Sequence, residues 1–171
     1  MLEKAESTYD TGFVIPDGVR NIGEGEFCAP VALLEVIIPD SVTGIGDGAF
    51  AGCDWIVGVE IPDSVDFIGN KAFYDCYSLV SVTMGDGVTS IGDDAFADCN
   101  QLESAELSKS LESIGDRAFA WCESLDCLSI PNNVADIGDD AFYGCGAGFV
   151  IRASAGSYAE RYAIENSIKF E

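Results

Sequence analysis

The sequence predicts an α/β solenoid in which one short unit is stacked six times along a single axis. The pair Ile-Gly recurs every 23 residues, and a Phe follows each Ile at a spacing of five. The six pairs are Ile22-Gly23, Ile45-Gly46, Ile68-Gly69, Ile91-Gly92, Ile114-Gly115 and Ile137-Gly138. A fixed period of about 20–29 residues is typical of solenoids, because each unit buries its apolar face only against its neighbours.

Each unit is expected to begin with a short strand. Leu79, Val82 and Met84 follow the spacing L-x-x-L-x-L, which recurs in the other units. Val82 and Met84 are two residues apart and therefore face one side of a strand, whereas Ser81 and Thr83 face the other. A proline follows the strand in four units, where its missing amide hydrogen suits the end of strand pairing. Strands that recur once per unit must be parallel, and we expect them to form one sheet.

A turn and a short helix, or a 3-10 turn, are expected to complete the unit. The Gly after each Ile indicates a position that needs a positive φ or a close approach by a neighbouring segment. Asp93 is placed to cap the short helix, as are its equivalents in other units. Ala95, Phe96 and Cys99 fall at helical offsets from Ile91. The helices would therefore cover the other face of the solenoid.

The chain divides into a lead-in, a solenoid and a closing segment. Residues 1–12 are polar and are predicted to be disordered, residues 13–153 form the repeats, and residues 154–171 form a cap. In the cap, residues 157–160 fit the capping box S-x-x-E, which would open a helix over the last unit. No comparable cap precedes the first unit. This predicts either truncation from a longer protein or self-association at the N-terminal end.

Charge and composition exclude several classes of function. The chain has 30 Asp and Glu against 8 Lys and Arg, a net charge of −22, which disfavours binding to nucleic acids and to anionic membranes. No run of about 18 apolar residues is present, so membrane insertion is not expected. The first residues lack the apolar core of a secretory leader, which leaves a cytoplasmic protein or a removed leader as alternatives. Because His is absent and no catalytic or phosphate-binding motif appears, neither an enzyme nor a cofactor is expected.

Seven cysteines raise the question of a disulfide or metal site. Five of them recur at the repeat period on the apolar face: Cys53, Cys76, Cys99, Cys122 and Cys145. Side chains stacked in this way point in one direction rather than at each other, and no closely spaced pair suits zinc. We interpret the column as small buried apolar side chains. Cys127 falls on the outward phase of its strand and is predicted to be an accessible thiol.

Two columns of acidic residues suggest a cation site as an alternative. The first comprises Asp17, Asp40, Asp63 and Asp86, and the second comprises Asp47, Asp93, Asp116 and Asp139. We interpret the first as turn residues and the second as helix caps. Stacked carboxylates repel each other, so a calcium-stabilised module stays open, although no known calcium-binding motif is present.

The repeat consensus L-x-x-V-x-I-P-D-S-V-x-x-I-G-x-x-A-F-x-x-C resembles the leucine-rich repeats of the BspA-like, or Treponema-type, class. Residues 38–53 carry it nearly complete, and the resemblance extends over residues 13–153 without an insertion. The tail is also similar to the C-terminal cap of this family. The resemblance implies a bacterial cell-surface or secreted protein that acts in adhesion and protein binding.

The exposed side of the strands is the predicted binding site, because a solenoid presents an extended surface of rigidly held side chains. The candidate ligand-binding residues are Glu35, Ile37, Glu60, Ser81, Thr83, Ser104, Glu106 and Ser129. Their small and acidic character predicts a modest, salt-sensitive interface with a basic surface on a protein partner. A structural spacer is an alternative. A pair of glycosidase carboxylates among Glu35, Glu60 and Glu106 is the least expected.

Overall fold

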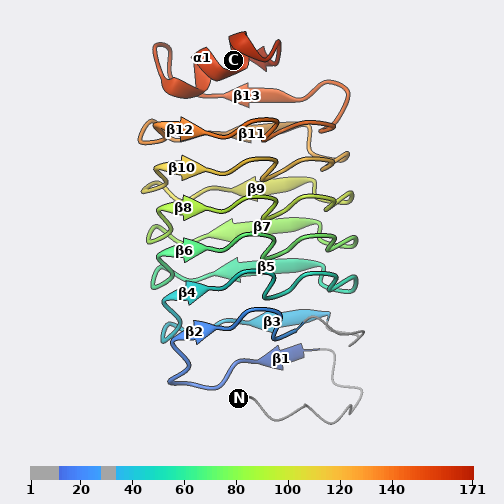
Figure 1. Ribbon diagram of the computed structural model, residues 1–171, viewed down its shortest axis with the longest axis vertical. Coiled ribbons are helices and arrows are strands. Elements are labelled where there is room, and N and C mark those ends of the chain that lie inside the picture. Colours follow the sequence, from blue (N-terminus) through green and yellow to red (C-terminus); the bar gives the residue numbers. More distant parts are fainter. Residues whose placement is uncertain (1–11, 28–33) are drawn as a thin grey trace.

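The chain winds into a solenoid of parallel strands, in which each turn lies directly on the one before it. Figure 1 shows these turns, here called rungs, stacked along the long axis, with the first described strand at one end and the C-terminus at the other. The computed structural model describes residues 12–27 and 34–171. Cys28 and nearly all of the predicted lead-in lie outside the described residues.

The first sheet is built from the strands that the repeat pattern predicts. Its five strands are β1 (Gly12–Val14), β3 (Glu35–Ile37), β5 (Gly58–Ile61), β7 (Ser81–Met84) and β9 (Ser104–Glu106). All pairings are parallel, and Val36, Val59 and Val82 align directly across the sheet. The same arrangement continues in a separate three-stranded sheet of β11 (Cys127–Ser129), β13 (Val150–Arg152) and β14 (Lys169–Phe170). The prediction of parallel pairing at the repeat period is confirmed.

A further sheet of two-residue strands contains the Ile of each Ile-Gly pair. Its six strands are β2 (Asn21–Ile22), β4 (Gly44–Ile45), β6 (Phe67–Ile68), β8 (Ser90–Ile91), β10 (Ser113–Ile114) and β12 (Asp136–Ile137). The expectation of one sheet is therefore wrong. Two-residue strands are too short to show the alternation by which a strand is found in a sequence.

The expected short helices do not form in the described rungs, where turns follow each Ile-Gly pair. The reason is a recurring left-handed residue. At one phase of the repeat φ is +60° at Gly48, +56° at Lys71 and +53° at Asp94. A left-handed residue cannot continue a right-handed helix, and the amides at and near it point along the solenoid axis. The N–H of Lys71 accordingly donates to the carbonyl of Asp93 in the next rung at 2.8 Å, and that of Phe73 to Ala95 at 2.7 Å.

One continuous core fills the space between the sheets. Its centre is a stack of phenylalanine rings from Phe27 to Phe142, with neighbouring centroids between 4.9 Å and 5.9 Å apart. The Gly of the Ile-Gly pair serves close approach rather than a positive φ. A Cβ added to Gly69, for example, would lie 2.7 Å from the backbone nitrogen of Asp47 in the preceding rung.

The C-terminal segment lies across the end of the last rung (Figure 1). Helix α1 (Tyr158–Glu165) begins after Ser157, whose hydroxyl accepts a hydrogen bond from the Glu160 amide at 3.1 Å. Tyr162 is buried against Phe142 with ring centroids 5.9 Å apart, and its hydroxyl accepts from the Ala141 amide. Within residues 12–27 and 34–171, no helix combines the length and the apolar character that a membrane crossing requires.

Candidate functional site

The outward side chains of the five-stranded sheet form two columns. One column aligns Gly12, Glu35, Gly58, Ser81 and Ser104. The second aligns Val14, Ile37, Glu60, Thr83 and Glu106. Every one of the eight candidate residues has an exposed side chain, as predicted. Ser129 lies at the same phase of the repeat, but its strand pairs with β13 rather than with β9.

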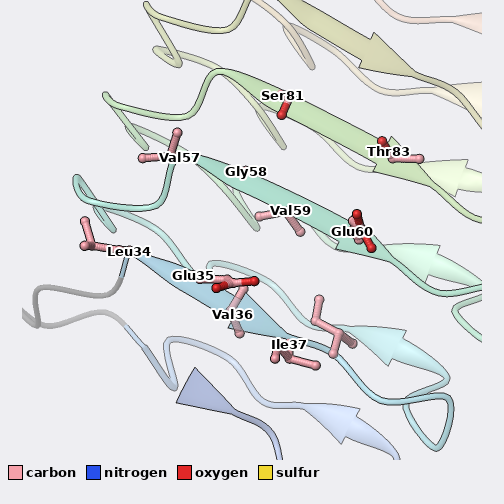
Figure 2. A pocket seen from close by; sticks show the side chains of 11 residues that line it. Leu34, Glu35, Val36, Ile37, Val57, Gly58, Val59, Glu60, Ser81 and Thr83 are labelled. Atoms are coloured by element: carbon pink, nitrogen blue, oxygen red, sulfur yellow. The ribbon is translucent and has the colours of Figure 1, made fainter. Parts of the chain in front are cut away.

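A hollow of about 490 Å³ opens on this surface across β3, β5 and β7. Figure 2 shows Glu35 and Glu60 on two neighbouring strands, with Ser81 and Thr83 on the third. Gly58 leaves the centre of the hollow open because it has no side chain. Even a Cβ atom added at this position would lie 3.2 Å from the Ser81 hydroxyl. The hollow therefore owes its shape to one glycine among longer side chains.

Aliphatic side chains that the sequence analysis missed border the hollow on one side. Leu34 and Val57 precede their strands, and their exposed fractions are 37% and 49%. Ile37, which was predicted, is 48% exposed. The sequence did contain a signal for these aliphatic side chains. Leu34, Val57 and Val80 recur at the repeat period, at a position outside the L-x-x-L-x-L pattern. The surface is therefore both apolar and acidic.

No two of the three glutamates lie at directly paired positions on neighbouring strands. Glu60 and Glu106 share a column with Thr83 between them, which separates their backbones by two strand spacings, about 10 Å. Glu35 belongs to the other column and aligns with Gly58. Retaining glycosidases place their carboxyl groups about 5 Å apart, which is closer than the backbone spacing between Glu60 and Glu106.

The acidic columns bond from rung to rung instead of capping helices. The Asp47 carboxylate accepts from the Asn70 amide at 2.7 Å, and the Asp93 carboxylate accepts from the Asp116 amide at 2.9 Å. The helix-cap interpretation is therefore wrong, because the group that is capped belongs to the next rung. In the part of the chain that the structure describes, no cluster of three or more Cys, Asp or Glu side chains is arranged to hold a metal ion.

The first acidic column also contains an ion pair. The Asp63 carboxylate accepts from the Asp86 amide at 2.8 Å, and Asp86 pairs with the Lys109 ammonium at 2.9 Å. The hydrogen bonds and the charge of Lys109 lower the pKa of Asp86. The residues of this column lie in turns, as predicted, but these contacts join one rung to the next instead of stabilising the turn locally.

The cysteine column is buried, as predicted, except at its last member. Cys53, Cys76, Cys99 and Cys122 are buried, whereas Cys145 is half-buried. The thiols donate to carbonyls of the preceding rung, as Cys76 does to Phe50 at 3.2 Å. Burial raises the pKa of Cys145 to about 12. Cys127 is half-buried on its strand, and the Arg152 guanidinium lies 3.3 Å from its sulfur.

Comparison with known proteins agrees with the repeat architecture. The family described as BspA type leucine rich repeat region matches residues 7–57 and 20–148, in six copies. A leucine-rich repeat protein of Treponema pallidum is similar in structure, with a TM-score of 0.70 and 30% identity over 83% of this chain and 64% of that one. A second similar structure is a leucine-rich repeat protein from Bacteroides ovatus ATCC 8483, with a TM-score of 0.50 and 28% identity over 82% of this chain.

The chain is shorter than these relatives, because it spans 64% of the Treponema pallidum protein and 48% of the Bacteroides ovatus protein. No curated protein matches the chain. The six matched copies equal the six units marked by the Ile-Gly pairs, and they extend over most of the sequence. The chain therefore belongs to the BspA type leucine-rich repeat family.

Proposed function

We propose that this chain is a non-catalytic protein-binding module and that the exposed face of the five-stranded sheet carries its binding site. The observation that supports this most strongly concerns Glu35, Glu60 and Glu106. Within the described residues, none of their carboxylates makes a hydrogen bond or an ion pair, although all three project from a hydrogen-bonded sheet. Unpaired carboxylates that project from a hydrogen-bonded sheet are available to a partner and do not contribute to the stability of the fold.

The chemistry of the hollow favours lysine and arginine side chains of the partner. Such side chains combine an aliphatic stem with a charged head. The stem would lie against Leu34 and Val57 where their strands begin, and the head would pair with Glu35 or, farther along the strands, with Glu60. The net charge of −22 would add long-range attraction for a basic surface and speed the encounter. The interface would therefore weaken as salt concentration rises.

The family supports a location at the bacterial cell surface, with adhesion as the role of the whole protein. The helical segment after the last rung would act as a cap that shields the core. A spacer that only separates other domains is the competing function, and it requires no ligand. The full-length gene would distinguish the locations, because a secretory leader and a wall anchor are expected for a surface protein and absent for a cytoplasmic one.

Selection from a random peptide display library against the wild-type chain would test the binding site. We expect peptides enriched in Lys and Arg. The double variant Glu60→Lys/Glu106→Lys should weaken their binding by about tenfold or more, mainly through slower association. The matched control is Glu112→Lys/Asp136→Lys, which changes the net charge equally at two exposed positions near the six-stranded sheet.

The control separates the local site from general electrostatics. Equal losses in both double variants would show attraction by net charge alone. Failure to select any specific peptide would favour the spacer. Thermal unfolding of both variants would verify that the substitutions leave the solenoid folded.

A further inference from the structure

A second group of exposed side chains lies where the turn regions of two successive rungs lead back toward the first sheet. A hollow of about 420 Å³ is lined there by Asp54, Trp55, Asp75, Tyr77 and Ser78. Trp55 is 55% exposed and Tyr77 is 53% exposed, although both are large aromatic side chains. None of these residues belongs to the outward columns of the five-stranded sheet. The hollow is thus a separate site from the one proposed above.

The two aromatic rings do not pack against another aromatic ring. Among the described residues, ring contacts join neighbouring phenylalanines of the core and also Trp121 with Tyr143, whose centroids are 5.0 Å apart. Trp55 and Tyr77 take part in no such contact. About half of each aromatic side chain is therefore accessible to a ligand, and burying these rings would remove a large apolar area from water.

The carboxylates of the hollow are also without a cation. Elsewhere in the described chain Asp94 pairs with Arg117 at 2.9 Å and Asp86 pairs with Lys109. Asp54 and Asp75 make no ion pair or side-chain hydrogen bond in the same part of the chain. Partial desolvation, followed by the negative charges of Asp54 and Asp98, raises the pKa of Asp75. The site therefore combines aromatic faces with negative charge that is not neutralised.

We propose that this hollow binds an alkylammonium group of the kind that ends a lysine side chain. The face of an indole or phenol ring attracts a cation electrostatically, and a nearby carboxylate adds an ion pair. The molecule already makes a contact of this type in the rung that contains Asp75 and Tyr77, where the Lys71 ammonium lies 5.7 Å from the centroid of the Tyr74 ring. Trp55, Tyr77, Asp54 and Asp75 supply the same two components without an internal cation.

A neutral sugar is the main competing ligand, since aromatic rings beside carboxylates can also stack on saccharides. The charge of the site decides between them. Two carboxylates that remain unpaired and raise each other's energy are stabilised by a cation, whereas a sugar hydroxyl leaves their repulsion in place. The experiment must therefore separate charge from stacking.

Tryptophan fluorescence provides a direct readout, because the chain contains only two tryptophans. In a Trp121→Phe background, Trp55 is the sole tryptophan, and its emission is followed with excitation that tyrosine does not absorb. We would titrate this protein with butylammonium chloride, which reproduces the lysine side chain, and in parallel with butan-1-ol and sodium chloride. We expect a saturable change with butylammonium, and only a weak, non-saturating change with either control.

Substitutions test the two components separately. Asp54→Asn/Asp75→Asn should weaken the apparent affinity by about tenfold, which corresponds to the loss of two exposed ion pairs. Asp17→Asn/Asp136→Asn removes the same number of charges from exposed positions elsewhere and should change the affinity less than twofold. Tyr77→Phe keeps an aromatic face and should retain binding, whereas Tyr77→Ala should lose it. Far-ultraviolet circular dichroism would verify the fold of each variant.

Three outcomes would overturn the proposal. The first is a response to sodium chloride equal to that with butylammonium. The second is equal weakening by the two double aspartate variants, which would assign the effect to net charge. The third is saturable binding of maltose that persists in Asp54→Asn/Asp75→Asn, which would identify the hollow as a platform for neutral saccharides.

Discussion

The Asp93 carboxylate accepts a hydrogen bond from the backbone amide of Asp116, which lies one rung further along the solenoid, at 2.9 Å. The bond joins equivalent positions of successive units and is repeated from Asp116 to Asp139. Asn70 takes the same place with its amide oxygen, which accepts from the Asp93 amide at 2.8 Å. The position therefore requires an acceptor oxygen but not a negative charge.

Replacing Asp93 by Ala should destabilise the chain by about 1 kcal/mol, because the Asp116 amide loses its partner. Asp93→Asn keeps the acceptor and removes one charge from a strongly acidic chain, so its stability should equal or exceed that of the wild type. Urea unfolding followed by circular dichroism would measure both. Equal destabilisation by Ala and Asn would show that the charge, rather than the hydrogen bond, matters.

The left-handed phase of the repeat offers a stabilising substitution. Asp140 has φ of +56°, and Gly25 and Gly48 occupy the same phase in the first two rungs. Because glycine adopts this conformation without steric cost, Asp140→Gly should raise stability by about 0.5–1 kcal/mol. Asp140→Ala removes the same charge without this freedom and should lower stability. A gain for both variants would assign the effect to charge.

Removing residues 154–171 should lower the melting temperature and cause aggregation, because Phe142 and the edge of the last strands become exposed. Tyr162→Phe is a milder test, since it keeps the ring but removes the hydroxyl that accepts from the Ala141 amide. We expect that variant to lose about 1 kcal/mol. Size-exclusion chromatography and calorimetry would measure these effects. A truncated chain that stays monomeric and equally stable would exclude a capping role.

Alkaline pH should destabilise the chain through its buried thiols. Burial raises the pKa of Cys145 to about 12 from an ordinary value of 9.0. The unfolded chain therefore releases this proton first, so stability is full below about pH 9 and falls as the pH rises toward 12. Each such thiol should cost about 1 kcal/mol at pH 10. Urea midpoints at pH 7 and pH 10 would measure the loss, and Cys145→Ala should reduce it. An unchanged pH dependence in that variant would contradict the assignment.

Salt should stabilise the folded chain, because its net charge of −22 produces self-repulsion that ions screen. We expect the melting temperature to rise with sodium chloride and calcium to add little at equal ionic strength. Differential scanning fluorimetry would compare the two salts. Saturable stabilisation by micromolar calcium would instead support the acidic columns as a metal site.

Features that leave an alternating pattern of apolar residues within one unit could be predicted from the sequence, and those that arise from backbone pairing between units could not. Val82 and Met84 reveal their strand because apolar residues alternate there over several positions. The pair Ser90–Ile91 is too short to show such a pattern, although backbone pairing across rungs makes it a strand. The left-handed residue at Lys71 was missed for a different reason: Lys and Arg give no sign of that conformation, and the glycines at the same phase, Gly25 and Gly48, occur only in the first two units.

The candidate site shows the same limit. The alternation of outward and inward residues correctly predicted that Glu60 and Thr83 are exposed. The hollow beside them arises where Gly58 aligns with Glu35 and Ser81, which is a relationship between three units. Likewise, Trp55 and Tyr77 stand at different phases of the repeat, so they show no common period, and only the stacking of rungs brings them to one hollow.

The hydrogen bond from each rung to the next also gives the solenoid a direction. The Asp47 carboxylate accepts a hydrogen bond from the Asn70 amide of the following unit. The side chain of Asn70 in turn accepts a hydrogen bond from the unit after that. A duplicated unit would therefore carry its own means of attachment. Such a duplication would lengthen the protein by about 4.8 Å and add one row to the binding surface. Gene duplication could thus lengthen the solenoid and its binding surface without altering the side chains that the surface already presents.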